Sequence, residues 1–156
     1  MHLISPDKVI RGKNAWNESI SEVVGISKRP LILGRSKNTR SIRLKISDDL
    51  KQSGLKVLHS ELEFDCCEED LTRIYNLARE KDCDSIIAAG GGKVLDAGKL
   101  IADYLAIPCI TVPLSASTCA GWTALANIYT SKGQFLKDVN LKSCPKILVC
   151  DHLFIK

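Results

Sequence analysis

The stretch DSIIAAGGGKVLDAGKL, residues 84–100, constrains the fold of this chain more than any other feature. The segment that ends at Gly90 is continuously apolar from Ile86 onward, which predicts a strand covered on both faces. Two more glycines and a lysine follow, and apolar residues then recur at helical spacing from Val94 to Leu105. A buried strand that runs through glycines into a helix is a building unit of parallel α/β sheets.

The rest of the chain repeats this alternation. Strands are predicted at residues 7–13, 29–36, 55–62, 107–114 and 146–151, and helices at 14–24, 41–52 and 66–83, with Gly25 ending the first helix. A small-residue loop at 115–122 precedes a hairpin of residues 123–130 and 134–139, with its turn at 131–133. We therefore predict an α/β fold in one domain spanning residues 1–156: a Rossmann-like parallel sheet with helices on both faces and an appended β-hairpin.

Composition excludes several classes of function. The 156 residues are 45% hydrophobic and 26% charged, as in a soluble globular protein, and no apolar run is long enough to cross a membrane. Aromatic residues make up 5%, and the net charge of +4 is not gathered on one segment, which disfavours nucleic-acid binding. Seven cysteines without a Cys-x-x-Cys pair predict reduced thiols, no metal site and a cytoplasmic location.

The glycine run itself allows two interpretations. Backbone N–H groups at the start of a helix, with Lys93 as an added charge, could hold a phosphate. The same glycines could serve only as a tight corner between strand and helix. Neither the Walker pattern nor the dinucleotide fingerprint fits, since Val94 follows the lysine and Leu95 occupies the position of the third fingerprint glycine. The run alone leaves both interpretations open.

A longer pattern favours the phosphate site. Gly-Gly-Gly-Lys-x-x-Asp-x-x-Lys from Gly90, Ile-Pro through Val-Pro, Ser-x-Ser-Thr and Ala-Leu-x-x-Ile-Tyr-Thr follow one another in order. Together they resemble the iron-containing alcohol dehydrogenase superfamily, and within it the cofactor-binding domain of glycerol dehydrogenases. The resemblance implies binding of NAD or NADP and, in the whole enzyme, hydride transfer between a small alcohol or polyol and nicotinamide.

The resemblance also implies roles for particular residues. The turn that holds the cofactor pyrophosphate corresponds to Gly90, Gly91, Gly92, Lys93 and Val94. Contacts on the adenosine side correspond to Leu114 and Ser117, and positions lining the nicotinamide to Thr123, Leu125 and Tyr129. Asp96 is expected to brace the glycine turn, and Lys99 to be a charge on the helix surface.

Two positions depart from the family pattern. Cys119 stands where glycerol dehydrogenases carry an Asp that holds substrate hydroxyls, which puts glycerol in doubt as the substrate. A buried, inert thiol is the favoured interpretation of Cys119 over a redox role. Arg35 stands where NAD-dependent members carry an acid against the ribose, so Arg35, Ser36, Lys37 and Arg40 predict a preference for NADP(H), with a solvated basic loop as the alternative.

The resemblance implies that iron or zinc is held by a helical C-terminal domain, which we expect to be absent from these 156 residues, so a metal is expected only in a longer form. The chain alone is then expected to bind a cofactor without catalysis, and to pair with a missing domain or a second copy of itself. Two alternatives stay open: a non-enzymatic cofactor-binding module, and a sugar-phosphate enzyme domain resembling dehydroquinate synthase.

Overall fold

The computed structural model describes residues 4–155. Six strands form one entirely parallel sheet in the order β1-β8-β5-β4-β2-β3. These strands are β1 (Lys8–Gly12), β2 (Pro30–Gly34), β3 (Leu58–Glu61), β4 (Ser85–Gly90), β5 (Cys109–Pro113) and β8 (Ile147–Asp151). The helices are α1 (Ala15–Ile26), α2 (Arg40–Gln52), α3 (Glu68–Glu80) and α4 (Gly92–Leu105), with a 3₁₀ turn at Lys37–Thr39.

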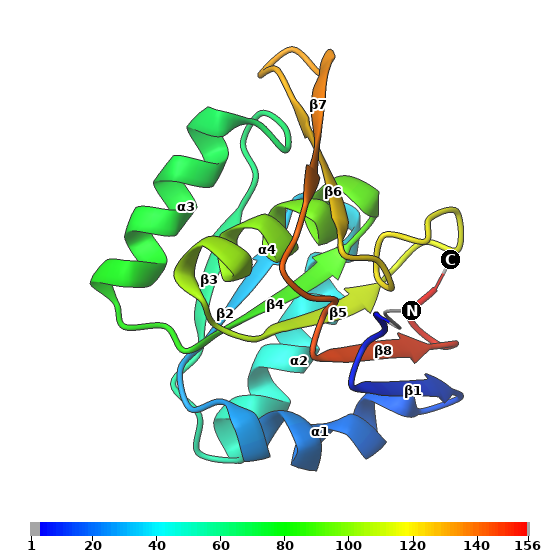
Figure 1. The fold of residues 1–156 in the computed structure, drawn as a ribbon. Coiled ribbons are helices and arrows are strands. Elements are labelled where there is room, and N and C mark those ends of the chain that lie inside the picture. The colour runs from blue at the N-terminus through cyan, green and yellow to red at the C-terminus, as the bar shows by residue number, and fades with distance from the viewer. Residues whose placement is uncertain (1–3, 156) are drawn as a thin grey trace.

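Helices cover both faces of the sheet, which confirms the predicted α/β architecture. In Figure 1, α1 and α2 lie below the strands, and α3 and α4 lie above them. The side chains of β4 alternate between two cores, one on each face of the sheet. Ile87 and Ala89 pack in the core between the sheet and helices α1 and α2, and Ile86 and Ala88 in the core between the sheet and helices α3 and α4. The continuous apolar run in the sequence follows from this burial on both sides.

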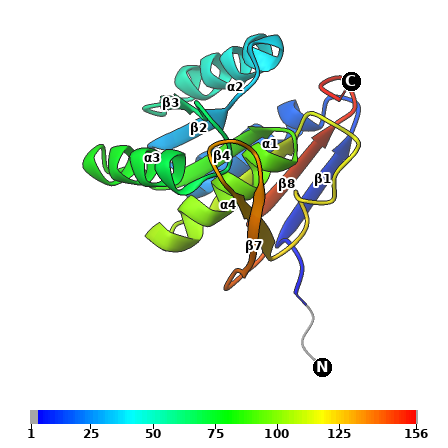
Figure 2. The ribbon, with the colours of Figure 1, turned by 90° about the horizontal axis from the view of Figure 1, so that it is seen from above.

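The predicted hairpin forms a separate two-stranded antiparallel sheet of β6 (Leu125–Tyr129) and β7 (Phe135–Asn140). It rises from the sheet in Figure 1 and lies over α4 when seen from above in Figure 2. The turn closes with a hydrogen bond from Thr130 N–H to the carbonyl of Gln134 (2.7 Å). Gly133 supplies the positive φ of 84° that this turn requires.

Several predicted boundaries were wrong. Gly25 does not end α1, which continues to Ile26, where Ser27 becomes extended while its N–H still reaches the carbonyl of Val23. Helix α4 begins at Gly92, two residues before the predicted start, because the N–H of Leu95 already donates to the carbonyl of Gly91 (3.0 Å). Strand β3 covers only Leu58–Glu61 of the predicted residues 55–62. Within residues 4–155, no helix is both long and apolar enough to span a bilayer.

Candidate functional site

The carboxyl ends of β2 and β4 border a groove of about 250 Å³ at one edge of the sheet. Ligands in open parallel sheets bind at this edge. The carboxyl end of β5 lies beside that of β4 at the same edge, since the N–H of Leu114, just after β5, donates to the carbonyl of Gly90 (3.0 Å). The groove brings together residues far apart in the sequence, namely Arg35, Ser36, Thr39, Gly90, Gly91, Gly92, Lys93 and Val94.

The glycines of the turn differ in whether there is room for a side chain at their position. A Cβ at Gly90 would lie 2.8 Å from the Cβ of Val94, so the strand-to-helix corner itself requires this glycine. A Cβ at Gly91 would meet nothing within 4 Å, so packing does not require that one. Gly91 is also the N-cap of α4 and has no side chain to cap it. The first N–H groups of α4 are therefore left to face an anion at the open groove.

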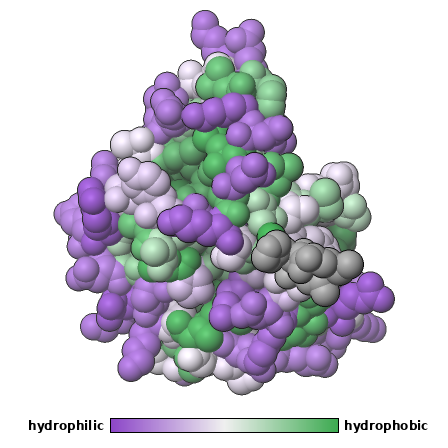
Figure 3. Space-filling view, in the orientation of Figure 1, coloured by the Kyte–Doolittle hydropathy of each residue, from purple (hydrophilic) through white to green (hydrophobic). Residues whose placement is uncertain are grey.

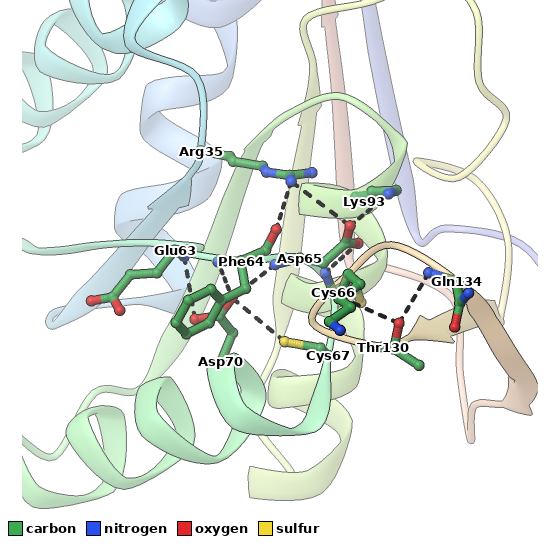
Figure 4. A network of polar contacts seen from close by, with 11 residues as sticks. Arg35, Glu63, Phe64, Asp65, Cys66, Cys67, Asp70, Lys93, Thr130 and Gln134 are labelled. Atoms are coloured by element: carbon green, nitrogen blue, oxygen red, sulfur yellow. Dashed lines mark hydrogen bonds and ion pairs between the residues drawn. The ribbon is translucent and has the colours of Figure 1, made fainter.

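The charge of the lining suits an anion. The groove is lined by two cations, Arg35 and Lys93, and by no carboxylate. Both cations contact the carboxylate of Asp65, which lies behind them and is only 3% exposed. Lys93 Nζ is 2.7 Å from Asp65 Oδ2, and Arg35 Nη2 is 3.7 Å from the same oxygen and donates to the carbonyl of Phe64 (2.7 Å), as Figure 4 shows. The three side chains carry one net positive charge.

Asp96 and Lys99 do not have the roles expected of them. Asp96 does not brace the glycine turn; its carboxylate accepts the N–H of Asn127 in β6 (3.1 Å). Lys99 is not a surface charge but is 2% exposed, with its ammonium 2.6 Å from the carbonyl of Leu125 and 3.1 Å from Asp96. Burial raises the pKa of the Asp96 carboxyl, and the Lys99 charge opposes that rise.

Lys93, Asp96 and Lys99 thus occupy one face of α4, three residues apart, and together they hold β6. Lys99 binds the start of the strand at Leu125, Asp96 binds its middle at Asn127, and the Lys93 ammonium lies 4.5 Å from the centroid of the Tyr129 ring at its end. This arrangement sets the hairpin beside the groove. The sequence pattern Lys-x-x-Asp-x-x-Lys therefore positions the strand that carries Leu125 and Tyr129.

The remaining predicted site residues do not line the groove. Leu114 is buried, and the hydroxyl of Ser117, on the exposed loop after β5, pairs with that of Ser115 (2.7 Å). Thr123 accepts a hydrogen bond from the Lys99 ammonium through its hydroxyl (3.1 Å). Cys119 is exposed, so the expectation of a buried thiol was wrong: the loop turns at this point, with Trp122 N–H donating to the Cys119 carbonyl, and leaves the thiol uncovered.

Sequence reasoning missed Asp65, Thr39 and Thr118. Thr118 lies under the glycine turn, where its Oγ1 would be 3.2 Å from a Cβ at Gly92. Asp65 belongs to a run of acids before α3 that reads as charge favouring a helix N-terminus. Its position after β3, whose carboxyl end lies at the same edge as Gly90, was the available signal.

The described residues do not fit a catalytic metal. Across residues 4–155, no three His, Cys, Asp or Glu side chains are grouped as a metal site would require. His59 lies on the edge strand β3, where its ring nitrogen Nε2 is 2.9 Å from the Ser47 hydroxyl and where burial lowers the pKa of its imidazole. Residues 4–155 therefore supply no ligand set for a metal.

A larger hollow, about 520 Å³, lies on the face formed by α3, α4 and the hairpin. Figure 3 shows apolar surface gathered there below the hairpin. Its lining includes Leu71, Leu100, Ile101, Ile128 and Val139, but no residue of the glycine turn and no convergent set of charged groups. We assign the candidate site to the smaller groove, because that groove combines free helix N–H groups with cations.

Comparison with known proteins identifies a family that shares this architecture. The family described as iron-containing alcohol dehydrogenase matches residues 6–152. Glycerol dehydrogenase of Escherichia coli is 29% identical over 147 residues, which are 94% of this chain and 40% of that protein. An uncharacterised oxidoreductase of Synechocystis is 45% identical over 92 residues, 59% of this chain and 24% of that protein. The chain therefore spans less than half of each of these relatives.

Two solved structures have the same fold as this chain. The crystal structure of glycerol dehydrogenase from Schizosaccharomyces pombe superposes with a TM-score of 0.87 at 29% identity, covering 99% of this chain and 39% of that one. A probable glycerol dehydrogenase from Sinorhizobium meliloti gives a TM-score of 0.85 at 24% identity, a likeness of fold.

Proposed function

This chain belongs to the iron-containing alcohol dehydrogenase family, and from that premise we propose that it binds a nicotinamide dinucleotide with the pyrophosphate on the turn Gly90–Val94. One observation carries the proposal. The uncapped N-terminus of α4 opens onto a groove bordered by Arg35 and Lys93, and Gly91 leaves room there that packing does not need. A helix N-terminus between two cations attracts a group that carries two negative charges.

Different residues of this chain would bind different parts of the cofactor. Backbone N–H groups of the glycine turn would donate to the pyrophosphate, and the adenosine side would meet Leu114 and Ser117. Thr123, Leu125 and Tyr129, held by Asp96 and Lys99, would face the nicotinamide. When bound, the nicotinamide supplies the carbon that gives or accepts a hydride. This chain's residues would bind and orient it, and we assign none of them a catalytic role.

In the whole protein we propose hydride transfer between this cofactor and a small alcohol or polyol, with zinc or iron in the longer form. Cys119, in the loop beside the glycine turn, would lie on the substrate side, and a thiol there is a poor partner for polyol hydroxyls. The names of the relatives support a dehydrogenase. They do not favour the non-enzymatic module or the dehydroquinate synthase-like alternative.

We also propose a preference for NADP(H). Arg35 and Ser36 line the groove where a ribose beside β2 would lie, and no acid lines it to repel a 2′-phosphate. The exposed Lys37 adjoins them. Arg40 contributes less than the sequence suggested, because it already pairs with Glu61 through distances of 3.1–3.3 Å.

Titration with NADH and NADPH, followed by quenching of Trp fluorescence, tests both proposals. We expect the chain to bind both cofactors, with a lower Kd for NADPH. Gly91→Asp should weaken the binding of both at least about tenfold, because it places a carboxylate against the pyrophosphate. Gly25→Asp makes the same substitution in α1, where a Cβ also meets nothing within 4 Å, and should leave affinity unchanged. Absence of binding would overturn the site, and tighter NADH binding would overturn the preference.

A further inference from the structure

Asp65 lies where three separate segments meet, and the proposed function gives it no role. It follows β3, and its carboxylate is enclosed by the β2–α2 connection, the glycine turn and the tip of the hairpin (Figure 4). Oδ1 accepts the N–H of Cys66 (2.7 Å), while Oδ2 faces the cations Lys93 and Arg35. A carboxylate that is 3% exposed is stable only when it is paired in this way.

The hairpin closes over this ion pair. A Cβ at Gly133, in the turn of the hairpin, would lie 3.3 Å from Asp65 Oδ2 and 3.8 Å from Lys93 Nζ. The N–H of Tyr129 donates to the carbonyl of Cys66, next to Asp65 (2.8 Å), and the Tyr129 ring receives the Lys93 ammonium. The ion pair therefore lies between the glycine turn and the tip of the hairpin.

We propose that Asp65 is a positioning residue for the cofactor groove: it holds the Lys93 ammonium between the glycine turn and the Tyr129 ring, so that an anion on the turn stabilises the hairpin. The proposal rests on the proposed function. Lys93 is a long, flexible side chain, 36% exposed, that would otherwise sample many rotamers. Its charge is useful to a bound pyrophosphate only from a fixed position.

A simpler role makes the opposite prediction. If Asp65 served only to reduce the positive potential of the groove, Asp65→Asn would raise that potential and tighten anion binding. If Asp65 positions Lys93, the same variant weakens binding despite the added positive charge. It should also have no further effect once Lys93 has been replaced.

The test uses ADP, which carries a pyrophosphate but no nicotinamide and so cannot touch the hairpin through the nicotinamide. We expect Asp65→Asn to weaken ADP binding about tenfold, with little additional loss in Asp65→Asn/Lys93→Met beyond Lys93→Met alone. In the unaltered chain, ADP should slow hydrogen exchange of residues 129–134 as well as of the glycine turn. In Asp65→Asn, only the glycine turn should be protected.

Glu68→Gln is the matched control, since it removes an exposed acid at the start of α3 and should change neither readout. If Asp65→Asn fails to fold, Lys93→Met gives the same exchange test, because Lys93 is only half-buried. Equal or tighter ADP binding by Asp65→Asn, or hairpin protection that survives in Lys93→Met, overturns the inference. Absence of ADP and NADPH binding by the unaltered chain would instead contradict the proposed function.

Discussion

The ammonium of Lys99, in the third turn of α4, lies 2.6 Å from the backbone carbonyl oxygen of Leu125, the first residue of β6. The same ammonium contacts the carbonyl and hydroxyl of Thr123 and pairs with Asp96, and it is almost completely buried. A backbone strand is thus fixed to a helix by a lysine. This accounts for a charged residue at a position that helical spacing alone would assign to a surface.

Lys99→Met should destabilise the protein by about 3 kcal/mol, because it leaves the Asp96 carboxylate buried without its cation. Asp96→Asn/Lys99→Met should recover part of that loss, since the remaining amide can still accept the N–H of Asn127. Chemical denaturation of the two single variants and the double variant measures the coupling. Equal stability of Lys99→Met and the unaltered chain would show that the pair does not hold the hairpin.

The sequence predicted the parallel sheet, its helices and the hairpin because each has a regular apolar period or turn residues. It did not predict where Asp96 and Lys99 point. The direction of these two side chains depends on β6, which follows α4 by about twenty residues and packs over the polar face of α4. The apolar period of α4 therefore gives no information about this contact. Asp65 was missed for a related reason: its partners Arg35 and Lys93 come from two other segments. Lys93 was identified from the glycine run that follows β4, and Arg35, the first residue after β2, from the family pattern.

Gly98 is expected to tolerate no side chain. A Cβ there would lie 2.5 Å from the Cβ of Ala88 in β4, closer than such atoms approach, so α4 would have to move away from the sheet. Gly98→Ala should therefore lower the free energy of unfolding by about 1–3 kcal/mol, although alanine favours helices. Thermal unfolding measures the loss. Gly91→Ala, where a Cβ meets nothing within 4 Å, is the control and should change stability little.

Asp70 should make the stability of the protein depend on acid pH. Burial opposes ionisation of Asp70, but hydrogen bonds from the N–H groups of Phe64, Asp65 and Glu63, and from Arg73, outweigh it and lower its pKa. A carboxyl whose pKa is lower when folded stabilises the protein above its unfolded value of about 4, and the contribution disappears as the pH falls through the folded value.

Asp70→Asn should accordingly be about 2 kcal/mol less stable than the unaltered chain at neutral pH. The difference should shrink as the pH is lowered below about 4. Urea denaturation at a series of pH values measures both, with Asp48→Asn, an exposed acid on α2, as the control. A gap that stays constant from neutral to acid pH would show that ionised Asp70 does not hold the loop that carries Asp65.

Cys119 should be the fastest-reacting thiol of the folded protein. It is exposed, whereas burial raises the pKa of Cys66 and of Cys109 to about 12 and leaves them little thiolate. An aromatic disulfide reagent at pH 8 should give one rapid phase of a single thiol, which Cys119→Ser removes, and denaturant should expose all seven cysteines. Persistence of the rapid phase in Cys119→Ser would mean that the loop after β5 covers this thiol and that another cysteine is accessible.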